Sequence, residues 1–312
     1  MLSLRARMIK FLLQHRHWIQ LKFKEEKVDW SKYESIINFR EEVEKGAKMY
    51  GKLANDIEVN QVIIGEMAAE WILPGEGTKD KVILYFHGGG YVAGTIKAHQ
   101  WVTSKFVTGS GIGALHFEYR LAPENPYPAA LEDSVMAYQW LLDQDIAPSN
   151  IVFVGDSGGG GLCLASLLYL RDHGYELPAA TVAYSPVTDH TCSGESHLIK
   201  AKVCLSPEGA GLAFGKHYAG DSDLKLPYIS PLFGDLEGLP PILIYVGGDE
   251  ALRDDSILFA EKAEKVGVDV TLRVGEGLFH CYPAMSPLFP EAKDAMEEIC
   301  KFINEHIGEQ AI

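Results

Sequence analysis

The chain has 312 residues, of which 47% are hydrophobic and 23% are charged, and its formal net charge is −15. This composition is typical of a soluble globular protein, and the length suffices for one large α/β domain or two small ones. The acidic balance argues against a nucleic-acid partner, because phosphates require a basic surface. The five cysteines are odd in number and lack metal-ligand spacing, so we expect free thiols and a cytoplasmic location.

Residues 1 to about 55 are expected to form helices that are rich in charged and aromatic side chains. The first of them is predicted to be amphipathic and basic, and we favour its docking as part of a cap over anchoring at a membrane surface. No run of about 18 apolar residues occurs, so no membrane span is predicted. The aromatic residues, which we expect to pack against neighbours rather than bind a cofactor, are Trp18, Phe23, Trp30, Tyr33, Phe39 and Tyr50.

Apolar runs further along the chain predict strands, several of them buried on both faces. The predicted strands cover residues 61–64, 68–73, 81–86, 114–119, 151–154, 180–184, 242–246 and 268–274. The helical patterns between them cover residues 128–142, 161–169, 254–265 and 291–307. This alternation predicts an α/β fold with βαβ units, right-handed crossovers and a mostly parallel central sheet flanked by helices.

Residues 188–223 interrupt the alternation. They follow a predicted strand, but their apolar residues show only weak periodicity. Long insertions at the carboxyl edge of a sheet are where lids are found. We therefore predict that residues 188–223 form a cap together with residues 1–55, over a catalytic domain of residues 56–312.

The segment Gly155–Gly159 fits the pattern Gly-x-Ser-x-Gly, in which a serine nucleophile lies on a sharp turn between a strand and a helix. The pattern alone is a weak signal, but here an apolar run precedes it and a helical pattern follows. The N-terminus of that helix would direct partial positive charge toward a developing oxyanion. The alternative is a glycine-rich turn in which Ser157 has no catalytic role.

The order of the candidate residues separates two classes of serine hydrolase. Ser157 lies mid-chain, an acidic cluster follows at Asp249 and Glu250, and His280 comes after the last predicted strand. Chymotrypsin-like proteases order their triad His, Asp, Ser, whereas α/β-hydrolases use Ser, then Asp or Glu, then His. The order favours the α/β-hydrolase fold. Asp249 and Glu250 both lie just past a strand end, so either could reach the histidine.

Three consecutive glycines follow the strand that ends at Phe86, in the run His87–Tyr91. Glycines let backbone N–H groups approach a substrate oxygen, and a loop at this place forms the oxyanion hole of such enzymes. We nominate Gly88, Gly89 and Gly158 as its donors, and we interpret His87 as a brace of the loop rather than a base. A phosphate-binding loop is disfavoured, because neither nucleotide-binding glycine pattern continues here.

Together these motifs resemble the hormone-sensitive-lipase-like (family IV) carboxylesterases of the α/β-hydrolase superfamily, over residues 60–310. The runs that carry the resemblance are His87–Gly90, Tyr119–Glu124, Tyr127–Ala130, Gly155–Gly159 and Leu252–Asp255. In that family the catalytic acid lies immediately before a short run ending in Leu-Arg-Asp, which implies Glu250. Aspartate is the commoner acid there, so Asp249 stays open as the alternative. The resemblance also implies a helical cap.

From these features we expect a serine carboxylesterase that hydrolyses short- to medium-chain acyl esters through an acyl-enzyme intermediate. Its triad would be Ser157, Glu250 and His280, and it would need no metal or organic cofactor. Its partner would be a small ester substrate, and a homodimer is compatible with the sequence. The alternatives are an amidase, deacetylase or lipase using the same triad, and a non-catalytic ligand-binding protein on the same fold.

Overall fold

The computed structural model describes residues 2–15, 28–47, 53, 56–75, 79–201 and 203–307, so the predicted aromatic packing of Trp18, Phe23 and Tyr50 lies outside the described residues. Its centre is an eight-stranded sheet of order β1-β2-β4-β3-β5-β6-β7-β8. The strands β1 and β2, and β2 and β4, pair antiparallel, and the remaining neighbours pair in parallel. The strands are β1(Ile57–Ile64), β2(Met67–Pro74), β3(Val82–Phe86), β4(Gly113–Phe117), β5(Ile151–Asp156), β6(Ala180–Tyr184), β7(Ile242–Gly247) and β8(Val270–Gly275).

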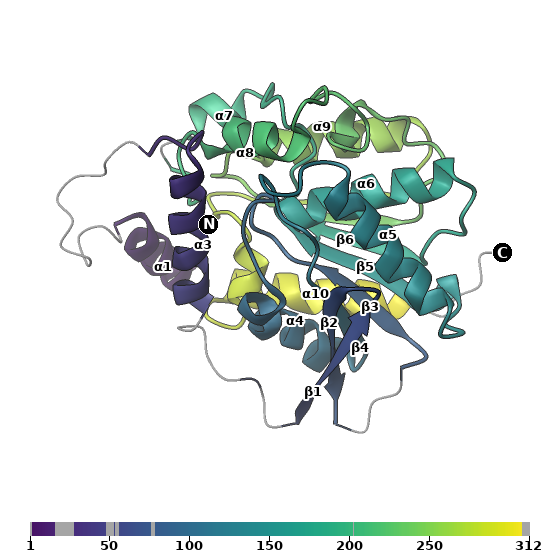
Figure 1. Ribbon diagram of the computed structural model, residues 1–312. Coiled ribbons are helices and arrows are strands. Elements are labelled where there is room, and N and C mark those ends of the chain that lie inside the picture. Colours follow the sequence, from purple (N-terminus) through teal and green to yellow (C-terminus); the bar gives the residue numbers. More distant parts are fainter. Residues whose placement is uncertain are drawn as a thin grey trace.

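Helices cover both faces of this sheet (Figure 1). α4 and α10 pack on one face, and α5, α6 and α9 on the other. The α-helices are α1(Leu4–Gln14), α3(Tyr33–Ala47), α4(Ile96–Ser110), α5(Ala129–Leu142), α6(Gly158–Asp172), α7(Ser196–Ile199), α8(Ala210–Ala219), α9(Arg253–Lys265) and α10(Pro290–His306). Short 3-10 turns occur at Pro148–Asn150, Pro231–Phe233 and Tyr282–Met285.

The strands in the middle of the sheet are buried along their whole length because apolar side chains point to both covered faces. Every residue of β3, β4, β5, β6 and β7 is buried, whereas β8 at the edge is partly exposed. One core cluster joins Phe153 to Leu164 and Phe259, and the other joins Tyr184 to Phe106 and Ile299. The rigid sheet that results fixes the ends of its strands relative to one another.

The predicted α/β fold is confirmed, with local differences. Each predicted strand is present within a few residues of its expected ends, but α4 was not predicted. Polar Thr103 and Ser104 lie among its buried residues and weaken its apolar periodicity. α6 begins at Gly158, three residues earlier than the helical pattern indicated, and residues 188–223 contain α7 and α8.

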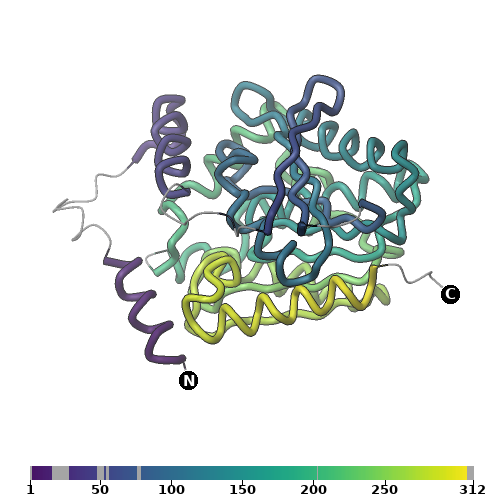
Figure 2. Tube along the Cα trace, turned by 90° about the horizontal axis from the view of Figure 1, so that it is seen from below, coloured from purple at the N-terminus to yellow at the C-terminus, as the bar shows by residue number. Residues whose placement is uncertain are grey.

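The N-terminal helices lie at one side of the sheet (Figures 1 and 2). α1 lies beside the start of α10, where Ser3 Oγ donates to Glu291 at 2.8 Å. α3 buries Ile36 completely.

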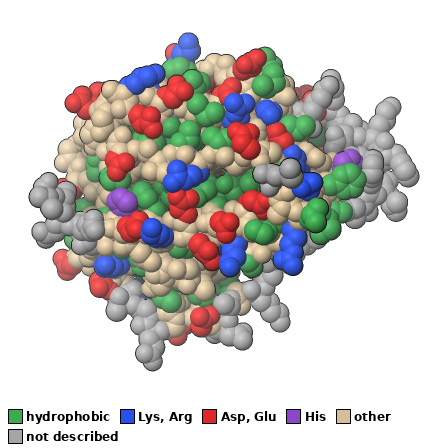
Figure 3. All heavy atoms as spheres, turned by 180° about the vertical axis from the view of Figure 1, so that it is seen from behind, with side chains coloured by type: hydrophobic (Ala, Val, Ile, Leu, Met, Phe, Trp, Pro, Cys, Tyr) green, Lys and Arg blue, Asp and Glu red, His purple; other side chains and the backbone are tan. Residues whose placement is uncertain are grey.

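Among the described residues, no helix is both long enough and apolar enough to cross a bilayer. On the face in Figure 3, acidic and basic side chains lie interspersed, so the negative net charge does not form one continuous acidic area there.

Candidate active site

Ser157 lies in the turn between β5 and α6. Its backbone has φ +52° and ψ −120°, in the left-handed region that non-glycine residues rarely adopt. The turn is closed by glycines that no other residue could replace. A Cβ on Gly159 would lie 2.1 Å from the carbonyl oxygen of Phe86, and one on Gly155 would lie 2.6 Å from that of Gly159. The flanking glycines therefore allow the close approach that exposes the serine side chain.

His280 and Glu250 meet Ser157 in one continuous chain of contacts. Ser157 Oγ lies 3.1 Å from His280 Nε2, and His280 Nδ1 lies 2.5 Å from Glu250 Oε2. Glu250 follows β7 and is completely buried, and His280 follows β8. The three side chains come from the carboxyl ends of three parallel strands, which meet at the same edge of the sheet.

Asp249, the alternative acid, points away from the histidine. Its carboxylate forms ion pairs with Lys10 of α1 and with Lys200, whose Nζ lies 2.9 Å from Oδ1. Burial acts to raise the pKa of Asp249, but the hydrogen bonds from the two lysines outweigh it and hold the pKa below 3.8. The structure therefore brings Glu250, and not Asp249, to the imidazole.

The imidazole of His280 has a raised pKa. Burial opposes the charged form, whereas the neighbouring Cys281 and Glu250 favour it, and the result is a pKa well above 6.5. Cys281 Sγ lies 3.5 Å from His280 Nε2, but burial raises the pKa of that thiol to about 11. The thiol is therefore neutral near pH 7 and favours the imidazolium only as a hydrogen-bond partner, and Glu250 supplies the negative charge beside the ring.

The glycine loop after β3 differs from the prediction at Gly88. Its N–H donates to Asp156 Oδ1 at 2.8 Å, so it is not free to bind a substrate oxygen, and its nomination as an oxyanion donor is wrong. The N–H groups of Gly89 and Gly90 donate to no protein acceptor among the described residues. A Cβ on Gly158 would lie 3.0 Å from the Gly90 nitrogen, so Gly90 and Gly158 adjoin. The sequence did not point to Gly90, because a Gly-Gly-Gly run does not show which of its three N–H groups is left without a protein acceptor.

His87 is buried within the loop rather than directed at Ser157. Its ring stacks on Tyr119 with the centroids 4.1 Å apart, and the hydroxyl of Tyr119 donates to the His87 carbonyl oxygen at 2.7 Å. Burial lowers the pKa of His87 to about 3, so the ring is neutral. These contacts fit the interpretation of His87 as a brace.

The N-terminal part of the chain covers the glycine loop. Trp30 and Phe39 pack against Phe214 of α8, with ring centroids 5.4 and 5.3 Å apart. The ring of Phe214 in turn lies where a Cβ on Gly90 would be, at 2.4 Å. Arg40 of α3 donates to the Val92 carbonyl oxygen at 2.6 Å. Two segments far apart in sequence thus meet over the loop.

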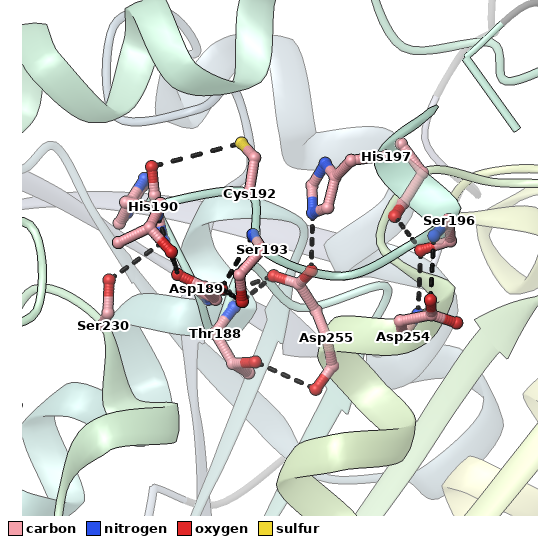
Figure 4. Close-up of polar contacts among 12 residues, drawn as sticks. Thr188, Asp189, His190, Cys192, Ser193, Ser196, His197, Ser230, Asp254 and Asp255 are labelled. Atoms are coloured by element: carbon pink, nitrogen blue, oxygen red, sulfur yellow. Dashed lines mark hydrogen bonds and ion pairs between the residues drawn. The ribbon is translucent and has the colours of Figure 1, made fainter. Parts of the chain in front are cut away.

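The segment after β6 is fastened to α9 by buried polar contacts (Figure 4). The backbone N–H groups of Thr188 and Asp189 both donate to Asp255 Oδ2 at 3.0 Å. His197 Nε2 of α7 lies 2.7 Å from Asp255 Oδ1. Because Asp255 is buried, one carboxylate joins three points of this segment to the start of α9.

A serine at a strand-to-helix turn, with a histidine after the last strand of such a sheet, defines the α/β-hydrolase class.

Comparison with known proteins supports the assignment to the α/β-hydrolase class. The model of the family with the alpha/beta hydrolase fold matches residues 83–284. An acetyl-hydrolase of Streptomyces hygroscopicus is 39% identical over 249 residues, which cover 80% of this chain and 83% of that protein. An esterase of Acinetobacter venetianus is 36% identical over 236 residues, 74% of this chain and 77% of that protein.

Solved structures extend the similarity to nearly the whole chain. EstE5, soaked with p-nitrophenyl butyrate, matches with a TM-score of 0.88 and 38% identity over 98% of this chain and 100% of that chain. An esterase from the bacterial hormone-sensitive lipase family matches with a TM-score of 0.88 and 35% identity, over 98% and 99%. The chain belongs to the hormone-sensitive-lipase-like esterases of the α/β-hydrolase family, and it is a carboxylic ester hydrolase.

Proposed function

We propose that the chain hydrolyses short- to medium-chain acyl esters with Ser157 as nucleophile. Ser157 Oγ attacks the ester carbonyl carbon while His280 Nε2 takes its proton. His280 then protonates the leaving alcohol, and an acyl group remains on Ser157. Water, activated by the same imidazole, releases the acid. The contact chain from Ser157 Oγ through His280 to Glu250 Oε2 is the observation that carries this proposal.

Glu250 holds the tautomer of His280 in which Nε2 can accept a proton, and its charge stabilises the imidazolium that forms. The backbone N–H groups of Gly89, Gly90 and Gly158 bind the oxyanion of the tetrahedral intermediate. One such donor contributes on the order of 3 kcal/mol to transition-state stabilisation. The mechanism needs no cofactor.

The preference for short chains is supported by two relatives. One relative is an acetyl-hydrolase, and the similar structure EstE5 was soaked with p-nitrophenyl butyrate.

We further propose that residues 1–55 and 188–223 form the cap over residues 56–312, which the packing of Trp30 and Phe39 on Phe214 supports. The five free cysteines favour a cytoplasmic location. A homodimer stays a proposal that light scattering can test.

Replacement of Ser157 tests the function directly. Ser157→Ala is expected to reduce p-nitrophenyl butyrate hydrolysis by about 10⁶-fold, because the nucleophile is lost. Labelling by a fluorophosphonate, which marks activated serines, should be lost with it. The matched control is Ser166→Ala, because Ser166 is buried in α6 and its hydroxyl has no hydrogen-bond partner among the described residues. Near-normal turnover by Ser157→Ala would remove Ser157 as nucleophile.

A further inference from the structure

Ser185 lies one residue past the end of β6 and bonds to both loops that carry the acid and the base. Its hydroxyl donates to Glu250 Oε1 at 2.8 Å. The same oxygen accepts the backbone N–H of Cys281 at 3.0 Å, and Cys281 is the residue next to His280. Ser185 is completely buried. One side chain therefore joins the loop after β7 to the loop after β8.

The backbone around Ser185 also holds the third member of the triad. The N–H of Ser157 donates to the Tyr184 carbonyl oxygen at 3.0 Å, and the N–H of Val187 donates to the Ser157 carbonyl oxygen at 3.1 Å. The bend of residues 184–187 thus contacts the nucleophile by its backbone, and the acid and the histidine loop by the Ser185 side chain. Its far end is fixed as well, because Thr188 donates to the buried carboxylate of Asp255 (Figure 4).

The two oxygens of the Glu250 carboxylate have different hydrogen-bond partners, and the Ser185 hydroxyl is one of them. Oε1 accepts from Ser185 and from the Gly247 N–H, and Oε2 is left to His280 Nδ1. A serine hydroxyl has one proton to donate and lone pairs to accept, and both capacities are used here. Ser185 also has φ +52°, a conformation in which a side chain is strained and persists only where its surroundings enforce it.

We propose that Ser185 is a positioning residue for the triad: its hydroxyl orients the Glu250 carboxylate and fixes the His280 loop against it. This inference rests on the proposed function of Ser157, Glu250 and His280. The Ser185 hydroxyl bonds to Glu250 and to the Cys281 N–H rather than to Ser157 Oγ or the His280 ring, so its effect is on how well the imidazole is aligned with Ser157 Oγ. Small misalignments of this kind lower the rate of the chemical step and leave substrate binding largely unchanged.

The test is steady-state hydrolysis of p-nitrophenyl butyrate by Ser185→Ala and Ser185→Gly. Both variants should lower kcat on the order of 10- to 100-fold with KM changed less than about twofold. Ser185→Gly removes the hydroxyl and also relieves the backbone strain, because glycine adopts positive φ freely. It therefore provides a second measurement if Ser185→Ala does not fold. Wild-type kcat in a folded Ser185 variant would overturn the inference.

A double-mutant cycle with Glu250→Gln distinguishes positioning from a general structural effect. If Ser185 acts through Glu250, adding Ser185→Ala to Glu250→Gln should lower kcat little further, whereas independent effects would multiply and overturn the inference. Ser166→Ala, a buried serine without a partner among the described residues, should retain wild-type kcat. A wild-type chain that neither hydrolyses the ester nor reacts with a fluorophosphonate would instead contradict the proposed function.

Discussion

Backbone strain gathers around the candidate triad. Among the described residues, the non-glycine residues with positive φ are Tyr91, Asp145, Ser157, Ser185, Cys192 and Cys281. Four of them adjoin the candidate site: Tyr91 follows the glycine loop, Ser157 is the proposed nucleophile, Ser185 bonds to Glu250, and Cys281 follows His280. Strained residues persist only where neighbouring contacts enforce them, so their clustering indicates that this edge of the sheet is held rigidly for catalysis.

Replacing Glu250 should change both the rate and its pH dependence. Only neutral His280 can accept the serine proton, so kcat/KM should rise with pH through the pKa of His280, which lies above 6.5. Glu250→Gln should lower kcat roughly 10³- to 10⁴-fold. It also removes the charge that favours the imidazolium, so the acidic limb of the remaining activity should move to lower pH. The measurement is kcat/KM for p-nitrophenyl butyrate across the pH range.

Asp249→Asn is the matched control, because it removes the neighbouring carboxylate that pairs with Lys10 and Lys200. Partly exposed ion pairs contribute at most about 1 kcal/mol each, so kcat should stay within about threefold of wild type. If Asp249→Asn were the more damaging change, the role of the acid would move from Glu250 to Asp249.

The site residues differ in how far sequence could predict them. The positions of Ser157, of the pair Asp249 and Glu250, and of His280 after three predicted strands indicated that these groups would meet. The family resemblance implied Glu250 as the acid, and the structure brings Glu250 to His280 and His280 to Ser157. The choice among Gly88, Gly89 and Gly90 depends on which N–H is taken by a protein acceptor. That acceptor is Asp156, 68 residues away, and no local pattern reveals such a contact.

The helices and strands also differ in how far the sequence could predict them. The middle strands were predictable because burial on both faces requires an unbroken apolar run. α4 was not, because its buried face includes Thr103 and Ser104, and α8 was not, because Gly211 and Gly215 interrupt its pattern. Tertiary packing, rather than local preference, stabilises such helices.

The attachment of α7 to α9 should make stability depend on pH. Burial opposes the charge of His197, but the hydrogen bond to Asp255 outweighs it and raises the pKa of His197 to about 10. A folded-state pKa above the ordinary 6.5 means that this stabilisation is complete below pH 6.5 and is lost as pH rises toward 10. The free energy of unfolding in urea should therefore fall across that interval.

His197→Gln should flatten this part of the pH dependence and lower the free energy of unfolding near pH 7 by about 2 kcal/mol, the scale of a hydrogen bond between charged groups. The control is His173→Gln, an exposed histidine at the end of α6, which should leave the profile unchanged. An unaltered slope in His197→Gln would show that other groups cause the dependence.

At the scale of the whole molecule, the glycine loop is held from two sides. Asp156, the residue before Ser157, accepts the Gly88 N–H from the end of β5. From outside, Arg40 of α3 bonds to Val92 and, through both guanidinium amines, to Glu124 at 2.7 Å. The ring of Phe214 of α8 packs against Gly90. The proposed oxyanion donors are thus held by the N-terminal segment as well as by the hydrolase sheet.

Deletion of residues 1–50 should therefore impair catalysis and not only stability. It removes Arg40 from the loop and uncovers Phe214, which is 7% exposed in the intact chain. Loss of one oxyanion donor lowers kcat about 10²- to 10³-fold, which sets the expected range for p-nitrophenyl butyrate. Binding of a hydrophobic dye should increase as apolar surface is uncovered. Full-length Arg40→Ala keeps the N-terminal segment but removes the bonds of Arg40 to Val92 and Glu124. This variant should lose part of the activity without the increase in dye binding. A soluble, fully active truncated protein would mean that these residues do not form part of the cap.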